Sequence, residues 1–81
     1  MKLHILKIEK SDYEDIITHK KKAELRKNDS KFEVDDLIHF VDIHGDDFYV
    51  YYNNAYRITH ILKDVPGLDK DYVILSIESF R

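Results

Sequence analysis

The chain is 81 residues long, carries 13 Lys and Arg against 16 Asp and Glu for a formal net charge of −3, and contains no Cys. These values fit one small domain over residues 1–81, and they exclude disulfides, a cysteine-based zinc site and bulk, non-specific DNA binding. No apolar run approaches the roughly 18 residues that span a bilayer. With no signal peptide in view, we expect a cytoplasmic domain.

The first residues predict one strand and then one helix. Residues 2–8 are rich in strand-forming side chains. The side chains expected to pack inward from this strand are Leu3, Ile5 and Leu6. Ser11 followed three residues later by Glu14 is a capping box, which predicts a helix over residues 12–19. The apolar stripe of this helix consists of Tyr13, Ile16 and Ile17.

Residues 20–36 hold the densest cluster of charge in the sequence. Apolar and charged side chains alternate along residues 22–27, which is typical of a strand with one buried and one solvent-facing side. On this pattern the inward side chains are Ala23 and Leu25, and the solvent-facing ones are Lys22, Glu24 and Arg26. Residues 28–30, Asn-Asp-Ser, predict a turn. A charged strand face that runs into a polar turn suits the binding of a small polar or anionic ligand.

The remainder of the chain predicts further strands linked by turns. These strands are expected over residues 37–43, 48–52, 57–62 and 72–80. Within residues 57–62, Ile58 and His60 are expected to share one face. Five or six mainly antiparallel strands with one N-terminal helix make an α+β fold, and a small barrel or half-barrel lets so short a chain bury a core.

Charge is unevenly divided along the chain. Residues 1–31 carry nine Lys and Arg against six Asp and Glu, a net charge of +3, whereas residues 32–81 carry four against ten, a net charge of −6. A basic first half could form a local anion-binding patch. The alternative is that the two halves interleave in space and the asymmetry disappears.

A resemblance to a known family is carried by several segments that together cover nearly the whole chain. The segment most specific to that family is Glu24-Leu25-Arg26-Lys27-Asn28-Asp29. The others are His4-Ile5-Leu6-Lys7-Ile8, Lys21, Phe32-Glu33-Val34-Asp35-Asp36, Arg57-Ile58-Thr59-His60-Ile61-Leu62, Gly67-Leu68 and Tyr72-Val73-Ile74-Leu75. Together they resemble the ASCH superfamily of PUA-like domains, and most of all a short bacterial and phage branch catalogued as a domain of unknown function. The resemblance implies a PUA-like β-barrel. Two glycines of that branch are His19 and Asp35 here, and both residue types tolerate a left-handed backbone better than most.

The resemblance further implies a cleft beside the helix that binds RNA or a modified nucleoside. The ligand-binding residues here would be His4, Lys21, Glu24, Arg26, Asn28 and Asp29. Arg26 offers a planar fork of donors to a phosphate or a base edge, while Asn28 and Asp29 can read the edge of an unpaired base. The structural alternative is an ion pair of Arg26 with Glu24 or Asp29 that holds the barrel together.

An amidohydrolase within the superfamily, which acts on N4-acetylcytidine, makes a small amidohydrolase the alternative function. Lys21 matches the catalytic lysine of that relative and would act as base or nucleophile. Glu24 stands at its threonine position and would shuttle the proton, whereas its later glutamate has no match here. The structural alternative for Lys21 is a solvated lysine at a helix end.

Three other features complete the expectations. The five histidines lack helical metal-ligand spacing, so we expect neither a metal nor a cofactor. The aromatic run formed by Phe48, Tyr49, Tyr51, Tyr52 and Tyr56 either stacks on bases or packs within a strand, and we favour packing because Asp46 and Asp47 would repel phosphates. A third hypothesis is a phage-type protein-interaction module, whose acidic C-terminal half meets a basic partner.

Overall fold

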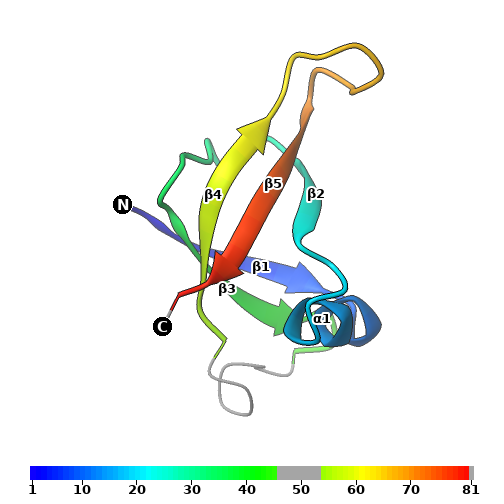
Figure 1. Cartoon of the computed structure of the whole chain (residues 1–81), viewed down its shortest axis with the longest axis vertical. Helices are drawn as coiled ribbons and strands as arrows, with labels where there is room; N and C mark the ends of the chain where they lie inside the picture. Colours follow the sequence, from blue (N-terminus) through cyan, green and yellow to red (C-terminus); the bar gives the residue numbers. More distant parts are fainter. Residues whose placement is uncertain (46–53, 81) are drawn as a thin grey trace.

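The computed structural model describes residues 1–45 and 54–80. The described elements are β1 (Leu3–Ile8), α1 (Lys10–Ile17), β2 (Ala23–Lys27), β3 (Leu37–Asp42), β4 (Tyr56–Leu62) and β5 (Tyr72–Ser79) (Figure 1). The α+β class and the early helix are confirmed. The strand expected over residues 48–52 lies outside the described residues, as does most of the aromatic run.

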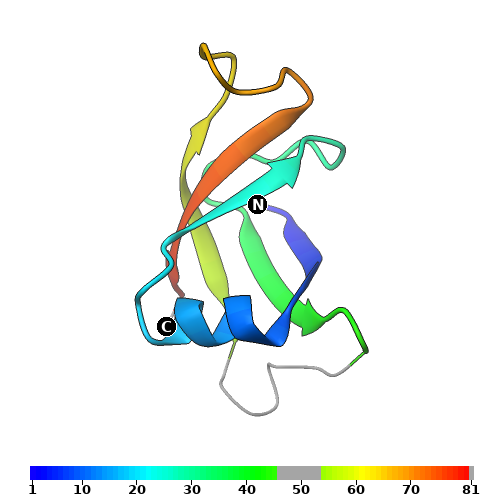
Figure 2. The same cartoon turned by 90° about the vertical axis from the view of Figure 1, so that its right-hand side faces the viewer.

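The five strands form one sheet in the order β1-β3-β4-β5-β2. Neighbouring strands are antiparallel except β1 and β3, which run parallel. A parallel pair needs a crossover connection, and here the crossover contains α1 and β2. The sheet curls into a half-barrel, so that its two edge strands, β1 and β2, come to face each other (Figure 2).

A side chain bridges these two edge strands. Nη2 of Arg26 in β2 donates a hydrogen bond of 2.7 Å to the main-chain oxygen of Lys7 in β1. We call this boundary between β1 and β2 the seam. A polar side chain faces the interior from each of these edge strands: His4 from β1 and Glu24 from β2.

Helix α1 lies across one end of the half-barrel (Figures 1 and 2). Its predicted apolar stripe is confirmed: Tyr13 and Ile16 are buried and Ile17 packs against the core. The predicted capping box of Ser11 is wrong, because the helix begins at Lys10 with Glu9 as N-cap, and no side chain caps it. Ile8 ends β1 inside the core, so the chain must turn into the helix at once if the first helical turn is to reach the same core.

The C-terminal end of α1 explains one of the two expected glycine positions. The N–H of His19 donates to the oxygen of Ile16 (3.1 Å), and the N–H of Lys20 donates to the oxygen of Asp15 (2.8 Å). This is the Schellman arrangement, in which the residue after the C-cap is left-handed and usually Gly. His19 has φ of 64° and Asp35 has φ of 77°. Both positions therefore have the left-handed backbone that the resemblance implied.

In strand β1 the expected inward position of Leu6 is confirmed, whereas that of Leu3 and Ile5 is wrong. Its buried side chains are His4, Leu6 and Ile8, whereas Leu3 and Ile5 are 61% and 65% exposed. Apolar residues occupy both faces of this strand, so the period-two pattern does not identify the inner face. The observed register carries a histidine into the interior.

The hydrophobic core lies between the concave side of the sheet and α1. Its members are Leu6, Ile8, Tyr13, Ile16, Phe32, Ile38, Phe40, Ile58, Val73, Leu75 and Ile77. In β4 a register shift between Ile58 and His60 interrupts the alternation. Ile58 is buried and His60 is exposed, so the expectation that they share a face is wrong.

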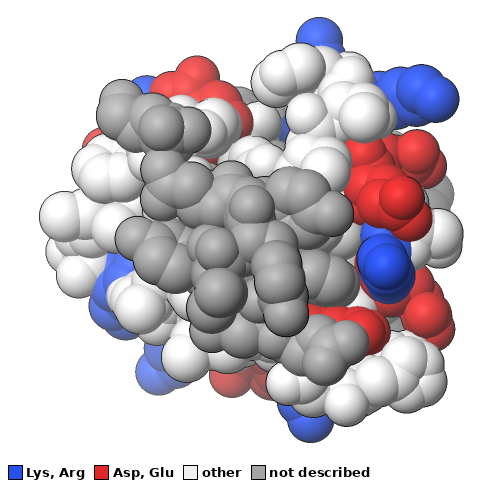
Figure 3. Space-filling model, turned by 90° about the horizontal axis from the view of Figure 1, so that it is seen from below, with Lys and Arg blue, Asp and Glu red and all other residues white. Residues whose placement is uncertain are grey.

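The surface shows how the charges are distributed on one face. Seen from below in Figure 3, acidic side chains gather mainly at the right of the view with a basic side chain among them, and other basic side chains are scattered around the visible rim. Among the described residues, no helix is long and apolar enough to cross a membrane.

Candidate functional site

Strand β2 turns its charges inward, the reverse of the orientation expected from its alternation. Only 5% of the surface of Glu24 is exposed, whereas Leu25 is 58% exposed. Burial of a carboxylate is costly unless opposite charges and hydrogen bonds compensate it. Neighbouring cations provide that compensation here, which is why a strand pattern that counts every charge as solvent-facing assigns the wrong face.

Two cations hold the two carboxylate oxygens of Glu24. Nζ of Lys21 contacts Oε1, and Nε of Arg26 donates to Oε2 at 3.0 Å. Lys21 also lies 3.7 Å from a carboxylate oxygen of Asp12 in α1. We call these four residues the Glu24 cluster. It joins the helix, β2 and, through the hydrogen bond of Arg26 to Lys7, the other edge strand.

The end of α1 places Lys21 for this contact. After the left-handed residue at position 19, the N–H of Lys21 donates to the oxygen of Asp15 at 2.9 Å. The lysine therefore leaves the helix on a fixed backbone, three residues before Glu24. Lys21 lies just after the helix end, and its partly exposed side chain (31%) lies against two carboxylates, so it is paired as well as solvated.

The structure brings together three of the predicted site residues, Lys21, Glu24 and Arg26, and their charged groups pair with one another. The Glu24–Arg26 ion pair, which was the structural alternative for Arg26, is present. Nε of Arg26 donates to Glu24 and Nη2 donates to the main-chain oxygen of Lys7, so these two donors of Arg26 already have partners within the protein. The cluster thus presents a partly exposed lysine and arginine around a carboxylate that is already paired.

Asn28 and Asp29 follow β2 on an exposed loop. The N–H of Asn28 donates to the oxygen of Asp71 at 2.7 Å, which fixes the start of the loop beside β5. The hydroxyl of Ser30 donates to Oδ1 of Asp29 at 3.2 Å. Both predicted side chains face solvent, where a ligand can reach them without disturbing the core.

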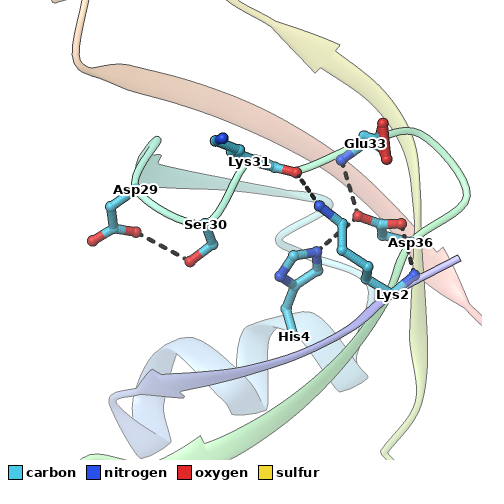
Figure 4. A network of polar contacts seen from close by, with 7 residues as sticks. All are labelled: Lys2, His4, Asp29, Ser30, Lys31, Glu33 and Asp36. Carbon is cyan, nitrogen blue, oxygen red and sulfur yellow. Dashed lines mark hydrogen bonds and ion pairs between the residues drawn. The ribbon is translucent and has the colours of Figure 1, made fainter.

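His4, the remaining predicted site residue, belongs to a different set of contacts. Its Nε2 lies 2.8 Å from Oδ2 of Asp36, and the two residues are 8% and 1% exposed (Figure 4). Asp36 also accepts the N–H of Lys2 at 2.9 Å and the N–H of Glu33 at 3.0 Å. We call His4, Asp36, Lys2 and Glu33 the Asp36 network. It ties the beginning of β1 to the loop that precedes β3.

The electrostatics of Asp36 follow from these contacts. Burial by itself raises the pKa of the Asp36 carboxyl, but the hydrogen bonds with His4, Lys2 and Glu33 together outweigh it and hold that pKa below its usual value. Asp36 is therefore an ionised, acceptor-only group at neutral pH. Nζ of Lys2 adds a further tie, because it donates to the main-chain oxygen of Lys31 at 2.7 Å.

Asp36 was not among the residues predicted from the sequence. The signal that could have found it is its spacing, because Asp36, Ile38 and Phe40 alternate and all face inward. An acidic residue in phase with core side chains indicates a buried carboxylate that needs partners. His4 stands in the same relation to Leu6 in β1.

Tyr56 is the member of the predicted aromatic run that the structure describes. Its ring meets Phe40 edge-on, with centroids 5.6 Å apart, and burial raises the pKa of its hydroxyl. At this position the favoured alternative, packing within a strand, describes the contact. The other members of the run lie outside residues 1–45 and 54–80.

The chain was compared with protein families and with curated proteins. A family model described as "Domain of unknown function (DUF3850)" matches residues 3–77. The match extends from the first residue of β1 into β5, and so includes the Glu24 cluster and most of the Asp36 network. The comparison with curated proteins gave no match. In the described part of the chain, no group of three or more His, Cys, Asp or Glu side chains is arranged to hold a metal ion.

Proposed function

We propose that this chain, which belongs to the DUF3850 family, is a small ASCH-type, PUA-like module that binds RNA or a nucleotide along the seam. The description of the family names no activity, so the proposal rests on the site itself. The ligand-binding residues are His4, Lys21, Glu24, Arg26, Asn28 and Asp29. They lie on the two edge strands that border the seam, on the turn that leads into β2 and on the loop that follows it. The half-barrel with one helix is compatible with the PUA-like part of this proposal.

The observation that carries the proposal is the polar interior beside the seam. A domain of 81 residues has a small core, yet a buried position on each edge strand holds a polar side chain. These side chains are Glu24 in β2 and His4 in β1, and His4 pairs with Asp36. Buried ion pairs add little stability compared with well-packed apolar side chains. Polar side chains retained at buried positions at this cost are candidates for a functional role.

The chemistry of the exposed edge suits a single nucleotide or an unpaired strand. Lys21 and Arg26 keep 31% and 21% of their side chains exposed, which leaves positive charge accessible for a phosphate. The amide of Asn28 and the carboxylate of Asp29 supply donors and acceptors for a base edge. A net charge of −3 disfavours long duplexes, so the attraction must be local.

An NMR titration tests the proposal directly. Isotope-labelled protein is titrated with single-stranded RNA, duplex RNA and nucleoside monophosphates while amide shifts are recorded. We expect salt-sensitive shifts at residues 21–29 and at His4. The double variant Asn28→Ala/Asp29→Ala should weaken binding about tenfold, because each lost hydrogen bond is worth roughly 0.5–1.5 kcal/mol. The control is His60→Ala, an exposed change outside the proposed site; a protein whose spectrum is unmoved by every ligand would refute the proposal.

One contact favours a second candidate, an amidohydrolase that acts on a modified nucleoside. Lys21 and Glu24, the two residues predicted to carry that chemistry, are in direct contact. A lysine acts as base or nucleophile only in its neutral form, and Glu24 is placed to accept the proton that Lys21 would have to lose. Lys21→Arg separates the candidates, because arginine keeps the ion pair but does not lose its proton. Loss of turnover with unchanged binding indicates an enzyme, whereas unchanged behaviour in both respects indicates a binding module.

A third candidate, a protein-interaction module, gains support from the outer face of β1. Leu3 and Ile5 are exposed side by side on an edge strand. The partner predicted for the acidic C-terminal half remains a separate proposal. A co-purifying protein, together with no nucleotide binding, would favour this candidate.

A further inference from the structure

His4 is a buried histidine with a fixed orientation. Its ring packs against Phe32, with ring centroids 4.6 Å apart, and its Nε2 lies 2.8 Å from Oδ2 of Asp36. Asp36 is itself held by two main-chain N–H groups, one on each carboxylate oxygen. Neither the ring nor its partner can turn without breaking these contacts.

This arrangement selects one tautomer of the imidazole. A carboxylate has no hydrogen to give, so Nε2 of His4 must be the donor in the contact with Asp36. In the neutral ring the other nitrogen, Nδ1, then carries a lone pair and acts as an acceptor. The depressed pKa of Asp36 agrees with this assignment, because it keeps the carboxylate ionised.

The acceptor nitrogen points away from Asp36. In Figure 4 it lies on the side of the ring where Asp29 and Ser30 are found. Within residues 1–45 and 54–80 it receives no hydrogen bond, and it is not among the polar atoms sealed from solvent. A side chain that is more than nine-tenths buried thus directs one unpartnered acceptor toward the loop of the proposed site.

We infer that His4 determines the base specificity of this site by accepting, at Nδ1, a hydrogen bond from the amino group of a nucleobase, with Asp36 as its positioning residue. The inference rests on the proposed function and names its ligand class, nucleotides with an exocyclic amino group. Cytosine and adenine present such a donor, whereas uracil and hypoxanthine present a carbonyl oxygen at the same place. Two acceptors that face each other cannot form this hydrogen bond, so we expect at least tenfold discrimination.

The first measurement reads the tautomer in the unmodified protein. Nitrogen NMR of the neutral His4 ring should show hydrogen on Nε2 and none on Nδ1. A neutral ring that carries its hydrogen on Nδ1 would overturn the inference. This measurement needs neither a variant nor a ligand.

The second measurement compares matched nucleotides. Cytidine and adenosine monophosphates should bind at least ten times more tightly than uridine and inosine monophosphates, respectively. His4→Phe keeps an aromatic ring against Phe32 but removes the acceptor, and it should abolish the difference. His60→Phe, a change on an exposed strand position, should preserve it.

The outcomes separate this inference from the function on which it rests. Equal binding of amino and carbonyl nucleotides overturns the inference and leaves the proposed function standing. No binding of any nucleotide or RNA overturns both. Discrimination that survives in His4→Phe also overturns the inference, and if that variant does not fold, the tautomer and the discrimination of the unmodified protein still decide it.

Discussion

Replacing His19 by glycine is predicted to stabilise the protein. His19 occupies the left-handed position that ends α1, with φ of 64°, and its side chain is exposed. A residue with a Cβ incurs a cost of about 1–2 kcal/mol in that conformation. Glycine relieves this cost, but its greater freedom in the unfolded chain offsets roughly 0.5–1 kcal/mol of the gain. The expected net stabilisation of His19→Gly is therefore about 0.5–1 kcal/mol.

Urea denaturation and calorimetry measure this effect. In a domain of this size, a change of about 1 kcal/mol in unfolding free energy moves Tm by roughly 4–8 °C, so His19→Gly should raise Tm by about 2–8 °C. His19→Ala is the matched control, because it removes the imidazole but keeps the Cβ, and it should give no comparable rise. The two hydrogen bonds that end the helix remain available in both variants, since they use only the main chain.

A reciprocal change checks the same reasoning from the other direction. Gly67 has φ of 87°, and a Cβ placed there would meet nothing within 4 Å. Gly67→Ala should therefore lower stability through backbone conformation alone, by about 0.5–1 kcal/mol. Equal stabilisation by glycine and alanine at position 19, or no loss at position 67, would refute the argument from backbone strain.

Three further predictions follow from the buried polar groups and the strand faces. Glu24→Gln should destabilise the fold by about 1–3 kcal/mol in urea melts, because two cations lose their charged partner; a variant as stable as the unmodified protein would contradict this. The pKa of Asp36 lies below its usual 3.8 in the folded protein, so its ionised form stabilises the fold above that pH, and this stabilisation disappears as the pH falls through the folded value. Asp36→Ala should therefore show a flatter dependence of unfolding free energy on acid pH, and an unchanged slope would be inconsistent with it. Leu25→Thr should change stability by less than about 0.5 kcal/mol because the side chain is exposed, while Ile38→Ala should cost about 2–5 kcal/mol.

The elements predicted most accurately from the sequence are those in which strand-forming residues follow one another without interruption. The runs that became β3 and β5 are rich in β-branched and apolar residues, and their expected ranges differ from the observed ones by a single residue at one end. The left-handed positions of His19 and Asp35 could be expected because glycine stands there in the similar family branch. In both cases local backbone preference and the tertiary structure agree.

The faces of β1 and β2 could not be predicted in the same way. In β1 both faces carry apolar residues, so only the packing of the whole sheet decides that His4 faces inward. In β2 the inner face is charged, and its burial depends on an ion pair between residues 24 and 26 and on Lys21, which the preceding helix delivers. The partners of Asp36 also come from other segments, residues 2, 4 and 33, although its spacing from Ile38 and Phe40 marks it as an inward-facing carboxylate.

The bridge of Arg26 to Lys7 also determines where the molecule can open. A barrel that closes through a strand ladder resists separation along a whole row of amide hydrogen bonds, whereas this one is joined across β1 and β2 by a guanidinium. Local opening requires little free energy where few such bonds must break together. Amide protons along the two edge strands should therefore exchange with solvent before those of β4 and β5, which would show that the half-barrel opens along this line before it unfolds.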